Sequence, residues 1–287
     1  MRICTCEIYG KRHSGLFTCD SIILFEEIAK ELNIDLPFTL DECIAKGSLE
    51  VVRSLIDDSD VAKLPGLPFS DITIRAPFLN PPKIWCIGLN FQGHADDLDA
   101  KRPTDGPGSF MKPSSTIIGP GDAIMLPPAK HTERVTGEAE LGVIIGKECK
   151  NISIEEAPEY ILGFTTIIDV TAEDLFLRNL RFLTRSKSFD TFLSFGPMIV
   201  TLDEIENISN LQITTMINTE VHRTNSVKNM MFSPYKIVAF HSEVMTLMPG
   251  DIFSCGTPGA VPLQPGDRVG CSISDIGSLE NPVQAGE

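Results

Sequence analysis

The segment over residues 135–146 reads Val135-Thr-Gly-Glu-Ala-Glu-Leu-Gly-Val-Ile-Ile-Gly146. It is an apolar, β-branched run typical of a buried strand, and Glu138 and Glu140 open it. Because strand side chains alternate between two faces, both carboxylates are predicted to lie on the same face. Two like charges beside a core repel each other and are costly to bury. A bound cation is the simplest partner that stabilises them, and a solvated strand face is the alternative.

A third carboxylate follows another apolar run, Gly163-Phe-Thr-Thr-Ile-Ile-Asp169. Asp169 is expected at the exit of a strand, where a rigid scaffold directs side chains into a pocket. The next residues, Thr171-Ala-Glu-Asp174, resemble a capping box that opens a helix, so a helix-capping Asp169 is the alternative. With Glu138 and Glu140 it would complete a set of hard oxygen ligands, which suit Mg²⁺, Mn²⁺ or Ca²⁺ and leave positions open for water and substrate.

Composition narrows the class of protein. The chain has 287 residues and a formal net charge of −15, which argues against nucleic-acid and anionic membrane partners. No apolar stretch is long enough to span a membrane, and the N-terminus lacks a signal peptide, so a cytoplasmic protein is expected. The eight cysteines contain no C-x-x-C pair and are expected to be buried free thiols.

Proline-rich segments divide the chain. Residues 1–80 predict a small N-terminal α+β domain with helices over 21–32 and 48–56. The prolines that follow, ending at Pro81-Pro82, stiffen the connection and mark the boundary. Residues 81–287 then form the second predicted domain.

The second domain is predicted to be rich in strands. Pro-Gly-Asp occurs at 120–122, 249–251 and 265–267, each time before a short apolar segment. Proline supplies the fixed φ of a turn and glycine the positive φ, so each triplet predicts a turn that feeds a strand. Shorter helices are expected at 154–157, 171–183 and 234–246. The predicted fold class is a mixed, β-rich α+β fold in which sheets roll around a core.

Three further residues could take part in chemistry. His94 follows a predicted strand exit in Gly88-Leu-Asn-Phe-Gln-Gly-His94-Ala-Asp-Asp97-Leu. A carboxylate one helical turn later can orient an imidazole as a general base, and an exposed histidine beside a surface aspartate is the alternative. Lys112 and Lys187 could neutralise an oxyanion or bind a substrate carboxylate, although most lysines are merely solvated.

Taken together, these segments resemble the fumarylacetoacetate hydrolase family, in its acylpyruvate hydrolase and oxaloacetate decarboxylase-like branch. The resemblance covers about residues 83–285 and rests on motifs in one order: Ile87–Ala95, Phe110–Ser115, Gly137–Lys147, Gly163–Ala172, Lys187–Phe192, Gly196-Pro197, Met245–Asp251 and Cys255–Pro258. It implies a C-terminal domain of rolled β-sheets and a homodimer. It also implies a divalent-metal-dependent hydrolase that cleaves a C–C bond of a 1,3-dicarbonyl or 2,4-dioxo acid, such as an acylpyruvate or fumarylacetoacetate, through a metal-bound enolate.

The resemblance also assigns roles to residues. Glu138, Glu140 and Asp169 would bind Mg²⁺ or Mn²⁺; His94 with Asp97 would activate water, and Lys187 and Thr257 would contact substrate oxygens. A decarboxylase, isomerase or cyclase that uses the same enolate is one alternative. A non-catalytic relative is another.

Several positions depart from the family pattern. Glu173 stands where the family often has arginine, Phe176 where it has glutamine, and Arg223 where it has another glutamine. The carboxylate after His94 is the shorter Asp97 instead of glutamate. Glu173 replaces a positive charge that could pair with a substrate carboxylate by a negative one. Arg223 is the candidate to supply a positive charge elsewhere. We therefore expect Glu173, Phe176, Arg223 and Thr257 to bind an unusual oxo-acid or diketone substrate, as in secondary metabolism.

Overall fold

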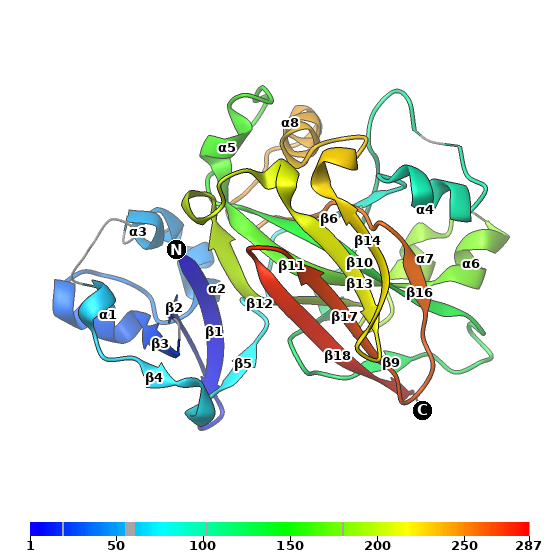
Figure 1. Cartoon of the computed structure of the whole chain (residues 1–287). Coiled ribbons are helices and arrows are strands. Elements are labelled where there is room, and N and C mark those ends of the chain that lie inside the picture. Colours follow the sequence, from blue (N-terminus) through cyan, green and yellow to red (C-terminus); the bar gives the residue numbers. More distant parts are fainter. Residues whose placement is uncertain (19, 55–60, 102, 180, 287) are drawn as a thin grey trace.

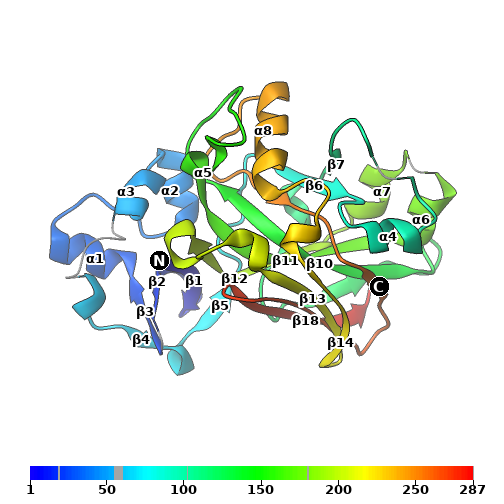
Figure 2. The same cartoon turned by 45° about the horizontal axis from the view of Figure 1, so that its top comes forward.

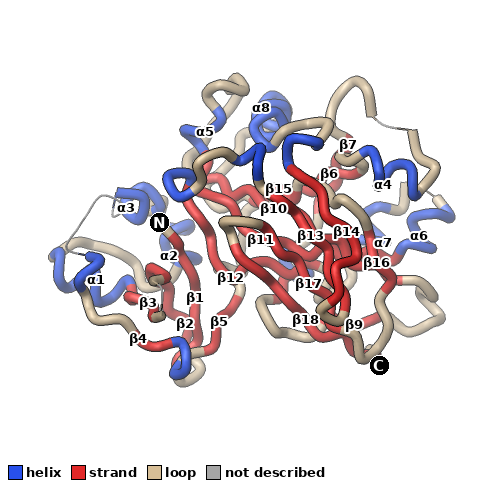
Figure 3. Tube along the Cα trace, viewed as in Figure 1, coloured by secondary structure: helices blue, strands red, loops and turns tan. Residues whose placement is uncertain are grey.

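The computed structural model describes residues 1–18, 20–54, 61–101, 103–179 and 181–286. These residues form one sheet of thirteen strands and one of five, with short helices around them (Figures 1 and 3). The mixed, β-rich α+β fold class is confirmed. No helix in the described part of the chain is long and apolar enough to cross a membrane. The described cysteines are free and buried as predicted, and Cys19 lies outside the described residues.

The N-terminal region lies on one side of the molecule, coloured blue to cyan in Figure 1. Its strand β1 pairs with β12 of the body, so the large sheet continues into this region. The domain division at residue 80 stays a prediction. The elements are β1 (Arg2–Ile8), β2 (Lys11–Phe17), β3 (Ser21–Leu24), α1 (Phe25–Leu32), α2 (Leu40–Lys46), α3 (Leu49–Ser54), β4 (Leu67–Pro68) and β5 (Thr73–Arg75).

The large sheet has the strand order β4-β3-β2-β1-β12-β11-β10-β15-β6-β7, and β5, β8 and β16 pair with β1, β12 and β10. The second sheet has the order β14-β13-β17-β18-β9. The strands of the body are β6 (Ile84–Gly88), β7 (Gly108–Met111), β8 (Ile117–Ile118), β9 (Ile124–Leu126), β10 (Val135–Ile145), β11 (Ile161–Ala172), β12 (Leu193–Thr201), β13 (Gln212–Ile217), β14 (Glu220–Ser226), β15 (Ile252–Ser254), β16 (Ala260–Pro262), β17 (Arg268–Ile273) and β18 (Gly277–Ala285).

The helices of the body are α4 (Gln92–Asp97), α5 (Ala157–Tyr160), α6 (Glu173–Arg178), α7 (Leu183–Lys187) and α8 (Pro234–Val244). Among the described residues of the helix predicted over 171–183, only residues 173–178 form a helix, α6, and α7 begins at the last predicted residue. The start is later than predicted because β11 runs on to Ala172. The helix predicted at 154–157 begins only at its last residue, and α8 matches the prediction for 234–246 except for its last two residues.

The first predicted helix, over 21–32, is wrong in its first turn. Residues 21–24 form β3, which pairs with β2 through Ile22 and Ile23. These β-branched residues favour the strand, and the helix begins at Phe25 after an extended Leu24. The second predicted helix is α3, and its residues 55 and 56 lie outside the described residues.

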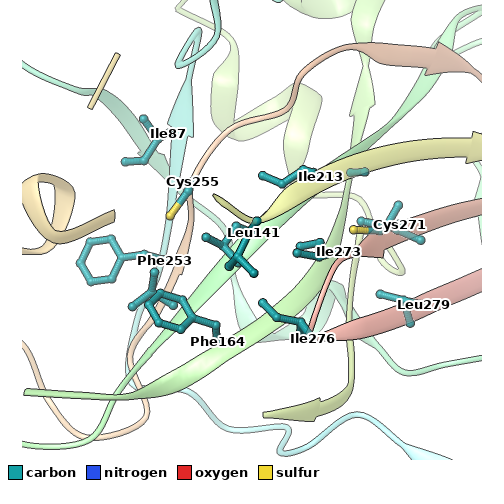
Figure 4. Packing of buried hydrophobic residues seen from close by; sticks show 14 of the residues in the cluster. Ile87, Leu141, Phe164, Ile213, Phe253, Cys255, Cys271, Ile273, Ile276 and Leu279 are labelled. Atoms are coloured by element: carbon teal, nitrogen blue, oxygen red, sulfur yellow. The ribbon is translucent and has the colours of Figure 1, made fainter. Parts of the chain in front are cut away.

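The side chains of β10 alternate as predicted. Its odd-numbered residues from Ala139 to Ile145 are buried in the main hydrophobic core, whereas Ile144 belongs to a second core cluster. Figure 4 shows Leu141 of β10 beside Ile213 and Ile273 of the second sheet. This alternation places Glu138 and Glu140 on the face of β10 that points away from the main core.

The three Pro-Gly-Asp segments form the predicted turns. Gly121, Gly250 and Gly266 have φ values of +77°, +85° and +97°, and they precede β9, β15 and β17. A Cβ at Gly250 would lie 2.9 Å from side-chain carbons of Ile44 in α2, whereas Gly121 has no heavy atom within 4 Å of that position. The turn before β15 is therefore also a packing contact with the N-terminal region.

Gly250→Ala is expected to destabilise the protein more than the matched variant Gly121→Ala. Both impose a positive φ on an L-residue, which costs about 1–2 kcal/mol. Only the former also forces a methyl group against Ile44, which adds about 1–3 kcal/mol. Urea denaturation measures the two unfolding free energies. Equal losses would show that α2 does not constrain this turn.

Candidate metal centre and pocket

The pairing of β10 with β11 brings three carboxylates together. Glu138 lies opposite Asp169 in the antiparallel register, and Glu140 follows on the same face of β10. Ligand oxygens of the three residues lie within 4.8 Å of one another, and all three side chains are buried. The structure therefore assembles the predicted triad.

Hydrogen bonds hold the two glutamates in place. The Thr171 hydroxyl donates to Oε1 of Glu138 at 2.7 Å. The Ser254 hydroxyl and the Gly256 N–H both donate to Oε2 of Glu140, at 2.5 and 2.7 Å. The predicted capping box at Thr171 is wrong, because this hydroxyl faces the triad and α6 has no side-chain cap.

Two buried lysines balance much of the charge of the triad. The Lys187 ammonium lies 2.8 Å from Oε2 of Glu138 and 2.7 Å from Oδ2 of Asp169. The Lys112 ammonium pairs with Oδ1 of Asp169 and donates to the Phe192 carbonyl at 2.7 Å. With every group ionised, three carboxylates against two ammonium groups leave one negative charge, and a divalent cation would turn it into one positive charge.

The pKa values reflect this crowding. Burial, followed by repulsion from Asp169 and Glu138, raises the pKa of Glu140 from 4.5 to about 8. Burial alone would raise the pKa of Asp169, but Lys112 and Lys187 outweigh burial and lower it. Burial opposes charge on Lys187, yet attraction to Asp169 and Glu138 prevails and raises its pKa. Glu140 is thus the carboxylate whose charge still lacks compensation.

The residues present fit a hard divalent cation. The donor atoms are carboxylate oxygens, and the hydrogen bonds that the Glu140 carboxylate accepts within the described chain both go to Oε2, which leaves Oε1 for a ligand. Glu138, Glu140 and Asp169 would hold the ion. Lys187 shares oxygens of two of them, so cation binding would compete with this ammonium group.

His94 is held at the same site by a buried loop. Asn90 donates to the carbonyls of Cys255 and Phe232 at 2.8 and 3.0 Å and so ties the segment before α4 to the segment that carries Thr257. His94 is buried, and its Nδ1 has no hydrogen-bond partner. Burial lowers the pKa of His94, which favours the neutral imidazole.

The structure gives Asp97 a different partner from the predicted one. Its carboxylate accepts two hydrogen bonds from the Arg223 guanidinium, with N–O distances of 2.5 and 3.3 Å. Among the described contacts, no hydrogen bond joins Asp97 to His94. Arg223 is therefore engaged on the outer side of α4, and the assigned roles of both residues stay predictions.

A cavity of about 540 Å³ lies over the triad. Its lining includes His94, Glu138, Glu140, Lys187 and Thr257, as well as the predicted substrate-binding residues Glu173 and Phe176. Three of the predicted site residues, Asp169, Asp97 and Arg223, are not part of this lining. The cavity thus joins most of the predicted site residues in one space.

Some functional neighbours were missed by sequence reasoning. Thr171 lies two residues after Asp169, so strand alternation could have placed it on the same face. Ser254 reaches Glu140 only because β15 pairs with β10, and Arg134 meets Glu173 through the adjacency of β10 and α6. No local signal in the sequence reveals the last two contacts.

Comparisons with known proteins agree with this geometry. A family profile described as fumarylacetoacetate (FAA) hydrolase C-terminal matches residues 83–284. The chain is 36% identical over 256 residues to the mitochondrial oxaloacetate tautomerase Fahd2a of Rattus norvegicus, covering 86% of this chain and 80% of that protein. Two solved structures match this chain over the full length of both proteins. Fumarylacetoacetate hydrolase from Exiguobacterium antarcticum has a TM-score of 0.83 and 31% sequence identity. Maleylpyruvate hydrolase from Sphingobium sp. SYK-6, in complex with manganese(II) and pyruvate, has a TM-score of 0.82 and 26% sequence identity.

Removing the bridging ammonium group is expected to make stability depend on metal. In metal-free protein, Lys187→Met leaves the buried Glu138 carboxylate without its cation and Asp169 with Lys112 alone, at a cost of about 3–5 kcal/mol. Mn²⁺ would restore much of this loss, so the variant gains more thermal stability from the ion than the parent does. Melting curves with EDTA and with Mn²⁺ measure it. The exposed pair Arg178–Asp174 supplies the control, Arg178→Met, with a loss below about 1 kcal/mol.

Metal binding is expected to release a proton at neutral pH. Below pH 8 Glu140 is mostly protonated, and a cation requires its ionised form. Because its folded pKa is raised, this group stabilises the metal-free fold at low pH, and that stability is lost as pH rises from 4.5 through about 8. Mn²⁺ affinity should therefore rise by about ten-fold per pH unit below pH 8 and level off above it.

Isothermal titration calorimetry in buffers of different ionisation enthalpy measures the proton release directly. Close to one proton should be released at pH 7 and almost none at pH 9.5. An equal release at both values would contradict the assignment to Glu140.

Proposed function

Because this chain belongs to the fumarylacetoacetate hydrolase family, a family of enzymes, we propose that it is a divalent-metal-dependent hydrolase of a 1,3-dicarbonyl or 2,4-dioxo acid. Membership of this enzyme family argues against the alternative of a non-catalytic relative. The observation that carries the proposal is a cluster of three buried carboxylates, two of which line the same cavity as the His94 imidazole. A homodimeric assembly and a cytoplasmic location stay predictions of the sequence.

The proposed cofactor is Mg²⁺ or Mn²⁺, held by Glu138, Glu140 and Asp169. Support comes from the hard oxygen donor set and from the manganese(II) in the similar maleylpyruvate hydrolase. Such an ion would act as a Lewis acid that polarises the carbonyl group of an oxo acid and stabilises the enolate charge. The ion also relieves the repulsion among the three carboxylates.

His94 is the proposed general base. Its neutral imidazole takes a proton from water as the water oxygen adds to the carbonyl carbon. The C–C bond then breaks, its electron pair leaves as an enolate, and the protonated His94 returns the proton to the enolate carbon. Atoms balance as one water molecule consumed for one carboxylic acid and one oxo acid released.

Lys187 and Thr257 are the proposed contacts to substrate oxygens. Both line the cavity beside the triad. Once a cation shares the charge of Glu138 and Asp169, the Lys187 ammonium becomes available to stabilise a developing oxyanion. The Thr257 hydroxyl lies in the turn that Gly259 closes with a 3.2 Å hydrogen bond, so its position is fixed.

A tautomerase or decarboxylase is the second candidate, because Asp97 pairs with Arg223 instead of His94. A lone imidazole can move a proton between carbon and solvent without activating water. The similarity to an oxaloacetate tautomerase supports this reading. Both candidates share the same carboxylates and differ in whether water adds.

Substitutions at Glu138, His94 and Asp97 test the assigned roles, and two substrates separate the candidate functions. Glu138→Ala is expected to abolish every activity, and His94→Asn to lower kcat by about 10²–10⁴-fold. Asp97→Asn is expected to lower hydrolysis by less than about ten-fold, because Arg223 already occupies this carboxylate. Assays would follow the cleavage of acetylpyruvate and the ketonisation of enol-oxaloacetate, each with Mg²⁺ or Mn²⁺.

Asp96→Asn, one residue earlier in α4, is the matched control. Mn²⁺ affinity checks that each variant keeps its metal centre. Unchanged hydrolysis in His94→Asn would overturn the base assignment. Ketonisation without any cleavage of acetylpyruvate would favour the second candidate.

A further inference from the structure

The walls of the cavity differ in character from its floor. The floor consists of the carboxylates on β10 with Thr171 and Lys187. The apolar residues that line the remainder include Leu89, Leu98, Pro103, Phe110, Phe176 and Leu183. They are contributed by the segments around α4, β7, α6 and α7, which Figure 2 shows together at one end of the molecule.

Phe110 connects the two regions. Its ring centroid lies 5.0 Å from the Lys187 ammonium, so apolar surface begins directly beside the triad. Phe176 lies three residues after Glu173 in the sequence of α6, and both line the cavity. A ligand whose oxygens reach the triad therefore has its remaining atoms among aromatic and aliphatic side chains.

Charge in the walls disfavours a second carboxylate on the ligand. The Glu173 side chain is mostly buried and pairs with the guanidinium of Arg134, which is 54% exposed. Among the described lining residues the only ammonium groups are those of Lys187, already paired with the triad, and Lys101, which is exposed near the exposed Asp99. A distal carboxylate would lose water and meet no buried cation there.

We propose that this cavity selects oxo acids with an uncharged apolar tail. Phe176 and Leu183 would contact the tail, and a second carboxylate is disfavoured because the described walls hold Glu173, whose charge Arg134 already pairs, and no buried unpaired cation. The inference rests on the proposed function for the binding of the oxo-acid head. A small dicarboxylate would leave much of a 540 Å³ cavity unfilled. An alkyl or aryl tail fills it and buries apolar surface on both partners.

Binding of inert 2-oxo acids to the Mn²⁺-loaded protein tests this selection without turnover. Pyruvate reports the head alone, 2-oxooctanoate adds an apolar tail, and 2-oxooctanedioate adds the same tail with a terminal carboxylate. Isothermal titration calorimetry should show 2-oxooctanoate binding at least about ten-fold tighter than pyruvate. It should also bind at least about ten-fold tighter than 2-oxooctanedioate, because the terminal carboxylate must be desolvated.

Variants assign the selection to residues. Phe176→Gln should reduce the advantage of 2-oxooctanoate over pyruvate several-fold, and the Mn²⁺ affinity and melting temperature of the variant check that it is folded and metal-loaded. Glu173→Arg should improve binding of 2-oxooctanedioate. Glu173→Gln, which removes the charge with little change of shape, should improve this binding to a smaller extent. It replaces Glu173→Arg as the test if the larger substitution impairs folding.

The outcomes separate this inference from the proposed function. If pyruvate binds and the tail adds nothing, or if 2-oxooctanedioate binds as tightly as 2-oxooctanoate, the tail selection is wrong and the proposed function stands. If no 2-oxo acid binds to the Mn²⁺-loaded protein, the head site fails, and the proposed function and this inference fall together.

Discussion

The antiparallel register of β10 and β11 is the constraint on which the site depends. It sets Glu138 opposite Asp169, and the period of two then adds Glu140 and Thr171 on the same face. A slip of one residue would turn the carboxylates into the core that Leu141 occupies. Because that core is filled by large apolar side chains, the hydrophobic pattern that builds the fold also fixes the geometry of the triad.

The electrostatic cost of burying three carboxylates together explains why two lysines lie beside them. Carboxylates on neighbouring strands cannot remain ionised in a buried site without counter-charge. Lys112 and Lys187, which lie before and after β11 in the sequence, supply part of this counter-charge. Asp169 is ionised because both ammonium groups contact it. The remaining imbalance falls on Glu140, whose pKa rises. A divalent cation would supply the missing positive charge, so the affinity for metal and the raised pKa of Glu140 would have the same cause.

The sequence predicted correctly those features that depend on residues close by in the chain. The alternation in β10 and the glycines of the Pro-Gly-Asp turns depend on neighbours in the chain, and both predictions were confirmed. It failed at residues 21–24, where pairing with β2 overrides helical spacing, and at Thr171, whose hydroxyl is taken by Glu138. The partner of Asp97 could not be predicted either, because Arg223 is brought to α4 by the path of β14, far away in sequence.

The departures from the family pattern are arranged in a way that bears on specificity. Glu173 and Phe176 both line the wall of the cavity, whereas Arg223 lies outside it and holds α4 through Asp97. The carboxylates and the lysine to which the proposed function assigns the head of the substrate keep the family pattern. Different residues in the cavity wall would change which substrates gain binding energy, while the groups proposed to act on the reacting atoms stay in place. In this proposal the chain combines the family's chemistry with a selectivity of its own.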